Sequence, residues 1–432
     1  MIQFILKNLW NRKGRYAWLV IELVIVTIIC WKLFDPVIYN TYNEHIPAGF
    51  NMDRLYRIQL MSYPDISSRY HAEESTPENN AAHIRRLMNK LRNYPDIASA
   101  TYLFKNLGPF STSSWKNYSD VDSTEQSYMV MFFEPKSDFF KTFQFEEIDG
   151  QSNEKLDQMD FNHGVVMSSP AFPKTPTLGY TFDDEDDDGN PVTWKVLATI
   201  KRIKMYSEYQ PFLVQIAPTT VEKESASQEL LETINLNFRI REGVDENAFL
   251  QEFIPWAKKE LRSGNLFVKD ISSYHHLADR IADLTGVNNT RRVNSIICIF
   301  FLICLILGVS GTFWMQTKSR REEIGVLKSF GGTPSYITRI LLGEGITLTT
   351  IATFIGCLLY LQYALKEGVT MDSYHADATG NLPIYWVNVF WKHFLGVSAI
   401  VWAILLVVVS IGIYIPARKI SRIQAVDALR DE

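Results

Sequence analysis

Few residues of this 432-residue chain have types and spacings that could do chemistry. The run DDEDDDGN at 183–190 puts Asp184 and Gly189 at the first and sixth positions of an EF-hand calcium loop. Such a loop needs a bidentate glutamate at its twelfth position, where this chain has Lys195. An acidic, exposed turn between strands is therefore the preferred interpretation.

The sequence offers no other metal or catalytic motif. His275 and His276 are adjacent, so on a helix they point about 100° apart and cannot share a metal. The run HAEES at His71 lacks the second histidine of a zinc-protease motif, and the phosphate-binding loop GxxxxGK[ST] is missing. We expect no catalytic residue, no metal site and no bound cofactor, so any ATP and its magnesium must be handled by another chain.

The most informative stretch is SRREEIGVLKSFGGTPSYI at 319–337, which lies between two long apolar runs. Gly331 and Gly332 stop a first helix, because glycine readily takes the left-handed conformation at a helix end. Thr333 then caps a second helix with Pro334 at its first position. The candidate coupling residues are Arg320, Arg321, Glu322, Glu323, Ile324, Leu327, Lys328, Phe330, Gly331 and Gly332. This pattern predicts a rigid helix, break and helix that can transmit a push; a solvated positive loop, or a unit lying across the membrane surface, stays open.

Four apolar segments are long enough to cross about 30 Å of hydrocarbon. They lie at about 16–34, 293–315, 340–365 and 394–415, and the residues between the first two have ordinary globular composition. Lysine and arginine concentrate in residues 7–15, in the stretch quoted above and in the tail. By the positive-inside rule both termini are cytoplasmic and the large domain faces outward, as in a bacterial inner-membrane protein.

The expected fold class is an α-helical membrane protein with a large outward α+β domain of two lobes between helices 1 and 2. All four cysteines fall within spans, so this domain has no disulfide. Strands are predicted at 52–62, 99–104, 127–133, 164–167, 193–203, 211–216 and 234–240, and helices from Thr76 and from Asp245. The predicted segments are 1–15 (amphipathic helix), 16–34 (span 1), 35–272 (outward domain), 273–292 (stalk helix), 293–315 (span 2), 316–335 (coupling segment), 336–365 (span 3), 366–393 (outward loop), 394–415 (span 4) and 416–432 (tail).

Two further expectations concern the spans. Glu22, Arg339 and Glu344 are ionisable groups at membrane depth, which calls for polar partners. We expect one of the two glutamates to pair with Arg339, although Arg339 could equally extend to the headgroups. Helical spacing without proline from 273 to 317 predicts one continuous helix about 65 Å long, with Gly286 as its weakest point.

At RREEIGVLKSFGGTPSYITRILLGEG the chain closely resembles the MacB/FtsX-like permeases of ABC transporters. Arg321, Glu323, Ile324, Gly325, Lys328 and Gly331 fall on the family's pattern after the second span. The tail PARKISRIQAVDALRDE resembles the family's closing motif, with Ala425 in place of a proline. DRLYRIQ at 53–59 and SDFFKTFQFEEIDGQ at 137–151 resemble blocks of the MacB-like outward domain, whereas GVVMSSPAFPKTPTLGYTF departs from it.

The resemblance implies a transporter subunit rather than an enzyme. In such proteins two permease chains, alike or paralogous, associate with two cytoplasmic ATPases, and the helix after the second span contacts the ATPase. The outward domain then handles a lipoprotein, a peptide or a toxic compound, sometimes with a periplasmic adaptor. Nucleic acid is not an expected partner. A receptor or sensor acting without an ATPase, and an FtsX-like regulator of cell-wall hydrolases, remain the alternatives.

Overall fold

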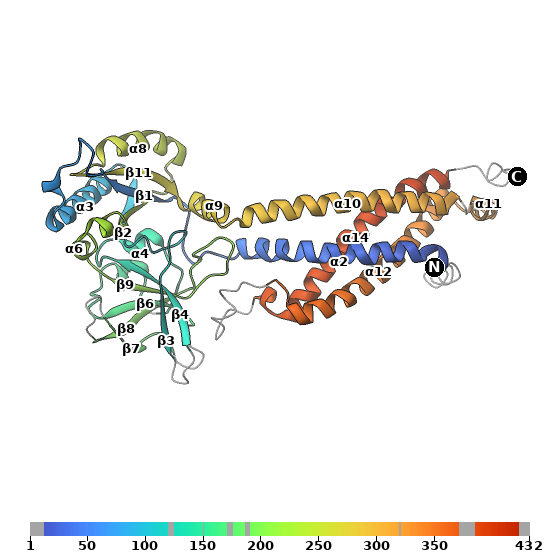
Figure 1. Ribbon diagram of the computed structural model, residues 1–432, viewed down its shortest axis with the longest axis horizontal. Coiled ribbons are helices and arrows are strands. Elements are labelled where there is room, and N and C mark those ends of the chain that lie inside the picture. The colour runs from blue at the N-terminus through green and yellow to red at the C-terminus, as the bar shows by residue number, and fades with distance from the viewer. Residues whose placement is uncertain are drawn as a thin grey trace. The chain divides into compact units, whose positions relative to one another are not determined.

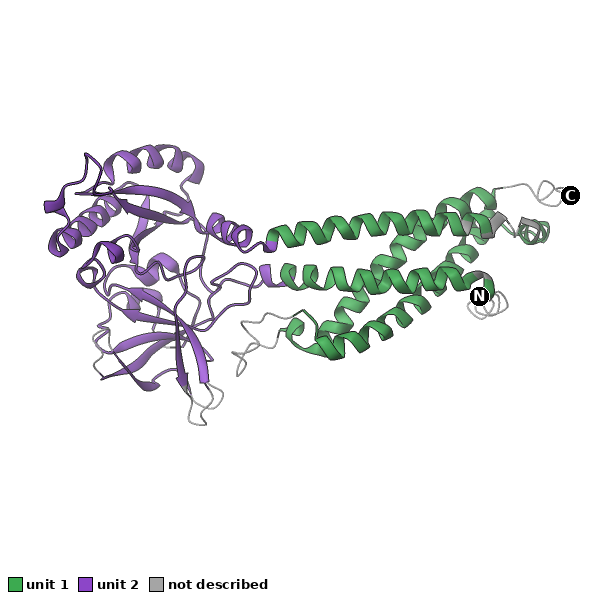
Figure 2. Ribbon diagram, in the orientation of Figure 1, with its two compact units in different colours: residues 1–41, 288–371, 384–432 green, residues 42–287, 372–383 purple. Residues whose placement is uncertain are grey.

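The computed structural model describes residues 13–119, 125–149, 151–170, 176–185, 191–318, 321–370 and 385–422 (Figure 1). The chain divides into two compact units (Figure 2). Unit 1 comprises residues 1–41, 288–371 and 384–432, and unit 2 comprises residues 42–287 and 372–383. Most of the predicted N-terminal amphipathic helix, half of the predicted loop 366–393 and most of the predicted tail 416–432 lie outside the described residues.

Unit 1 is built on four long helices. They are α2 (Lys13–Glu44), α10 (Val287–Lys318), α12 (Pro334–Glu367) and α14 (Phe390–Ser421), with α11 (Arg321–Ser329) and the short 3-10 helix η2 (Trp386–Asn388) between them. All four are long and apolar enough to cross a membrane, with mean hydropathies of 2.2, 2.6, 1.6 and 2.7 over their most apolar stretches. The predicted four candidate spans are thus confirmed, and each helix is longer than the span predicted for it.

One apolar core holds the four helices of unit 1 together. It includes Leu19 and Trp31 of α2, Val309 of α10, Ala352 of α12 and Val401 of α14, all of them buried. Small residues let the helices approach closely: the Ser310 hydroxyl on α10 donates to the backbone oxygen of Gly412 on α14 at 2.8 Å. Such small and hydroxyl-bearing residues are typical of helix contacts within membranes.

The described residues of unit 2 form two sheets. The first has the strand order β11-β1-β10-β2 and is antiparallel throughout. Its strands are β1 (Leu55–Ser62), β2 (Ile97–Leu103), β10 (Asn235–Ile240) and β11 (Leu266–Ser273). Helices α3 (Pro77–Arg92) and α8 (Glu246–Glu260) pack on this sheet (Figure 1), and side chains such as Leu87 and Phe253 form one core with it.

The second sheet is mixed, with the strand order β3-β4-β9-β6-β8-β5 and with β7 paired to β8. Its strands are β3 (Trp115–Ser119), β4 (Glu125–Phe133), β5 (Glu147–Asp149), β6 (Gly164–Ser168), β7 (Thr181–Glu185), β8 (Pro191–Ile200) and β9 (Val214–Pro218). The shorter helices of unit 2 are η1 (Ala72–Glu74), α4 (Phe139–Phe143), α5 (Asn153–Leu156), α6 (Val221–Glu224), α7 (Gln228–Leu231) and α9 (Tyr274–Leu284). Phenylalanines of α4 pack on this sheet, and Tyr274 of α9 joins the same core.

A strand lies at each of the seven predicted positions, and both predicted helices are present, α3 capped by Thr76 and α8 by Asp245. Four strands, β3, β5, β7 and β11, were not predicted. The prediction of one continuous helix from 273 to 317 is wrong. The chain breaks between α9 and α10, where Gly286 takes a left-handed φ of 77° that ends a helix. The break thus falls at the predicted weak point, next to the boundary between the two units.

Candidate coupling segment and buried polar residues

The predicted coupling helix is α11, a helix of nine residues with one face in the bundle core. Ile324 is 5% exposed and packs in the core of unit 1, whereas Leu327 is half-buried. Phe330, directly after the helix, is 87% exposed. The residues of the predicted apolar stripe therefore have different environments. Ile324 packs α11 against the bundle, whereas the aromatic ring of Phe330 is exposed.

The end of α11 is fixed by a complete C-terminal cap. Gly331 has a φ of 87°, and its N–H donates to the Lys328 oxygen at 2.9 Å. The N–H of Gly332 donates to the Leu327 oxygen, also at 2.9 Å. This pair of bonds is the Schellman motif, which satisfies carbonyls that a helix end leaves without partners. A Cβ atom on Gly332 would lie 2.7 Å from the Leu327 oxygen, so both glycines are needed.

Helix α12 begins two residues later. The Thr333 side chain accepts a hydrogen bond from the Tyr336 N–H at 3.2 Å, and Pro334 occupies the first turn. The predicted helix, break and helix are thus present in the structure. Of the ten predicted coupling residues, Arg320 and the side chains of Arg321 and Glu322 lie outside the described residues, while Glu323 is exposed and Lys328 half-buried.

The intramembrane charges are arranged differently from the expectation. Glu344 is 1% exposed and accepts a hydrogen bond from the Tyr16 hydroxyl at 3.2 Å. Glu22 lies over Gly308 of α10, where a Cβ atom would stand 2.5 Å from a Glu22 carboxylate oxygen. Arg339 is exposed and, within the described part of the chain, forms no ion pair with either glutamate. The pairing hypothesis is therefore wrong: the bundle buries Glu344 and half-buries Glu22, whereas Arg339 stays at the helix surface.

The sequence analysis missed a buried pair that links α2 to α14. The pair lies at the ends of these helices that are remote from the coupling segment. Asp35 and His393 are 3% and 0% exposed, and an Asp35 carboxylate oxygen lies 2.6 Å from His393 Nε2. The other oxygen accepts from the Thr370 N–H and hydroxyl at 3.0 and 2.8 Å. His393 Nδ1 faces the Val387 carbonyl at 2.6 Å and must carry a hydrogen, because a carbonyl only accepts. Both ring nitrogens of His393 thus have a polar partner within unit 1.

A second missed residue is Lys204, which caps the end of α2. Its ammonium, on a side chain only 3% exposed, donates to the backbone oxygens of Asn43, Glu44 and Ile46 at 2.6, 3.1 and 3.0 Å. Burial lowers the pKa of Lys204 to about 8, against the opposite effect of the Glu44 and Glu208 carboxylates. A cation at this place satisfies carbonyls at the negative end of the helix dipole. No local pattern around Lys204 pointed to it, because its partners lie about 160 positions away in the chain.

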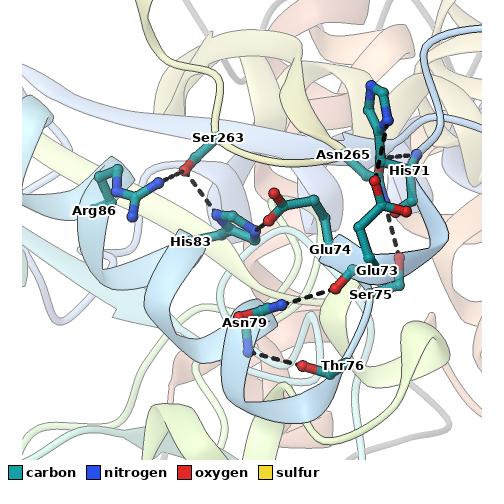
Figure 3. A network of polar contacts seen from close by, with 10 residues as sticks. All are labelled: His71, Glu73, Glu74, Ser75, Thr76, Asn79, His83, Arg86, Ser263 and Asn265. Atoms are coloured by element: carbon teal, nitrogen blue, oxygen red, sulfur yellow. Dashed lines mark hydrogen bonds and ion pairs between the residues drawn. The ribbon is translucent and has the colours of Figure 1, made fainter.

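One cluster in unit 2 contains the side-chain types of a hydrolase triad (Figure 3). His83 Nδ1 lies 2.9 Å from the Ser263 hydroxyl, and Nε2 lies 2.8 Å from Glu74. Arg86 also donates to the Ser263 oxygen, at 3.3 Å. Ser263 is 7% exposed and already accepts from a guanidinium, so it is not poised as a nucleophile. The cluster instead ties α3 to the turn before β11, beside the Asn265 contacts to His71 and Ser75 (Figure 3).

The acidic run proposed as a turn connects β7 and β8, which pair antiparallel. Its residues 186–190 lie outside the described part of the chain. Asp184 forms an ion pair with Lys116 and accepts from the Tyr118 hydroxyl at 3.1 Å. Among the described residues there is no group of three or more histidine, cysteine or acidic side chains that could hold a metal ion.

Comparison with known proteins finds a family match for the C-terminal part of the chain. Residues 295–425 match the family of the FtsX-like permease C-terminal domain, and this range contains α11, α12, α14 and the larger part of α10. This match agrees with the resemblance noted in the motif after the second span. A search of the curated proteins finds no match to the chain.

Solved structures similar to the chain include the periplasmic region of MacB from Actinobacillus actinomycetemcomitans. It is 14% identical over 54% of this chain and 94% of that one, with a TM-score of 0.30. Another is the extracellular domain of the ABC-type transporter YknZ from Gram-positive bacteria, 12% identical over 50% of this chain and all of that one, with a TM-score of 0.27.

Proposed function

We propose that the chain is the membrane subunit of an ABC transporter, in which a separate cytoplasmic ATPase drives movement of the domain between α2 and α10. The observation that carries this proposal is the capped break after α11, with Phe330 87% exposed beside it. An exposed aromatic side chain on a rigid support is the kind of anchor that fills a pocket in a partner protein.

The coupling segment has the mechanical properties that this function needs. Ile324 fixes α11 to the bundle, and the cap at Gly331 fixes the direction in which the chain enters α12. A push on α11 would therefore move α12 rather than be absorbed in a loose loop. The receptor alternative does not require this rigidity.

The exposed faces of the four long helices support insertion in a membrane. Trp18, Phe300, Phe354 and Leu395 are between 60% and 72% exposed, one on each helix. Side chains of this size and number need an apolar surrounding. We place the protein in the bacterial inner membrane, with both termini cytoplasmic because lysine and arginine concentrate on that side.

The most apolar stretch of α10 is only 17% buried within the chain, which leaves most of this helix for lipid or for a second copy or paralogue. The chain itself binds no cofactor in this proposal, and ATP with magnesium belongs to the ATPase. The transported material is proposed to be a peptide, a lipoprotein or a toxic compound handled by unit 2.

The test is purification of the tagged protein from its native membranes in mild detergent, with mass spectrometry of the retained chains. We expect a stoichiometric partner that carries GxxxxGK[ST]. Phe330→Asp should abolish its retention, because a charge would replace the aromatic anchor. Ile66→Asp is the matched control, because Ile66 is 93% exposed but belongs to unit 2.

Retention of the ATPase by Ile66→Asp but not by Phe330→Asp would support the coupling role. Equal retention by both variants would move the contact away from α11. If no ATPase is retained by the wild type even after crosslinking, the transporter proposal fails, and the receptor or sensor becomes the leading function.

A further inference from the structure

A hollow of about 400 Å³ lies between the start of α12 and the end of α14. Arg339 reaches it from α12, and Arg418 and Arg422 reach it from α14; Ser335, Thr338 and Tyr414 also line it. We propose that this hollow is a binding site for an anionic phospholipid, with the lipid phosphate held by the three guanidinium groups.

The charge of the hollow favours a phosphate. None of its lining residues is acidic. Among the described residues none of the three arginines forms an ion pair with a carboxylate, and Arg418 instead lies 5.8 Å from the centre of the Tyr414 ring. Guanidinium groups present forked donors that match phosphate oxygens. The end of α14 carries a partial negative charge of only about half an elementary charge. This is too small to neutralise both Arg418 and Arg422, so the hollow keeps a net positive charge.

The arginines of two helices line one hollow, which distinguishes this site from the scattered lysines and arginines usually found beside cytoplasmic span ends. On α12, Ser335, Thr338 and Arg339 follow helical spacing along one face, and on α14 Arg418 and Arg422 are one turn apart. The Thr338 hydroxyl lies 3.2 Å from the Ser421 hydroxyl and joins the two helices at the hollow. The two faces therefore form one cationic hollow between packed helices, rather than charges spread over a surface.

The surroundings of the hollow favour a lipid over a soluble anion or an acidic protein segment. Leu342 lines it, and Ile346, one turn further along α12, is 43% exposed. On α14, Tyr414 and Ile411 are 45% and 49% exposed. The cationic end thus continues into apolar surface on both helices, which suits a ligand with a phosphate and acyl chains. Basic hollows between spans at the membrane boundary are known to hold headgroups with one or two phosphates.

The neighbouring Lys419 provides a matched control. It is exposed and adjacent to Arg418, but its ammonium lies 4.7 Å from the centre of the Trp314 ring on α10 and is not part of the hollow. Lys419→Gln removes one positive charge from the same turn of α14. Arg418→Gln and Arg422→Gln remove charges from the hollow while keeping side chains that can donate hydrogen bonds.

The experiment measures lipid binding to the full-length protein, purified in detergent without the ATPase, by native mass spectrometry with cardiolipin, phosphatidylglycerol and phosphatidylcholine. We expect the wild type to bind the two anionic lipids in preference to phosphatidylcholine. The Arg418→Gln/Arg422→Gln variant should bind them at least 10-fold more weakly, and Lys419→Gln within about 2-fold of wild type. Elution volume and far-ultraviolet circular dichroism check that each variant is folded.

Three results would overturn the proposal. The first is equal loss of lipid in the arginine variant and in Lys419→Gln, which would indicate a diffuse charge effect. The second is displacement of the lipid by millimolar inorganic phosphate or glycerol 3-phosphate, which would indicate a site for free phosphate. The third is unchanged lipid binding with loss of the ATPase in co-purification, which would indicate a protein contact. Because lipid binding is measured on the chain alone, failure of the ABC proposal leaves this result interpretable.

Discussion

Replacing Lys204 by methionine tests whether the cap on α2 holds the structure of unit 2 together. The substitution keeps the apolar stem but leaves three backbone oxygens, those of Asn43, Glu44 and Ile46, without the ammonium. The Asn43 oxygen keeps the hydrogen bond from the Ile46 N–H at 3.1 Å, whereas Ile46 is buried and its oxygen loses the ammonium; a buried acceptor without a partner costs about 1–3 kcal/mol. Part of this loss of stability is offset, because the variant no longer has to bury a charged ammonium. We therefore expect a net local loss of about 1–3 kcal/mol, or about 5- to 150-fold in the opening equilibrium.

Hydrogen exchange followed by mass spectrometry on the full chain in detergent measures this opening locally. Peptides that cover 42–50 and 203–212 should exchange faster in Lys204→Met by that factor, while peptides of α3 keep their rate. Lys201→Met is the control, because Lys201 pairs with Glu146 at the surface with a side chain 59% exposed. Exposed pairs contribute about 0–1 kcal/mol. If the two variants exchange alike, the cap does not stabilise this region and the reasoning is refuted.

The pH dependence of the same residue has a definite sign. The folded-state pKa of Lys204 is lowered to about 8, whereas an unfolded lysine titrates near about 10.4. Between these values the unfolded chain binds more protons, so the free energy of unfolding rises with pH, by at most about 1.4 kcal/mol per unit. The stability difference between wild type and Lys204→Met should be constant below pH 7 and grow from pH 8 to pH 10. The measurement is guanidinium unfolding at each pH, monitored by near-ultraviolet circular dichroism. A difference in unfolding free energy between the two proteins that does not change with pH would contradict the lowered pKa of Lys204.

Two other perturbations have clear expected outcomes. His393→Phe leaves the Asp35 carboxylate buried without its imidazole and should cost about 3–5 kcal/mol, seen as a lower thermal midpoint in detergent, whereas replacing both residues by leucine should cost less. Gly264→Ala would place a Cβ atom 2.3 Å from His83 Nε2 at a φ of 54°, so it should lower the denaturant midpoint more than Gly243→Ala. Gly243 has a φ of 83° with open space around it, so this comparison separates the clash from the backbone strain, and equal midpoints would show that the His83 cluster tolerates displacement.

The features predicted correctly from the sequence are those that local rules determine. Thr76 and Thr333 cap α3 and α12 because a hydroxyl before a proline satisfies the first free N–H groups of a helix. Gly331 ends α11 because few other residues take its left-handed conformation. The four spans follow from apolar length alone. The motif at 320–345 also anticipated the match to the FtsX-like permease C-terminal domain, which covers the same helix, break and helix.

The features that the sequence did not reveal depend on contacts between distant residues. Asp35 and His393 are 358 positions apart, and their local surroundings show only a charge at the end of each apolar run. The strands β7 and β11 were missed because TFDDE is acidic and LFVKDISS loses its apolar alternation halfway. Arg339 was paired with a glutamate on the general expectation that membrane charges have partners, but it lies at the hollow beside Arg418 and Arg422.

The break at Gly286 changes how motion would pass along the chain. A glycine within a helix costs only about 1 kcal/mol, so spacing alone favoured a continuous helix from 273 to 317. In the structure α9 and α10 are separate, whereas α2 continues through Pro36 to Glu44, where Lys204 caps it. Of these two connections, α2 is thus held at its end by Lys204, and the other is interrupted at Gly286. In the proposed transporter, α2 is therefore the connection suited to carry force, and Gly286 the one suited to absorb a change of direction.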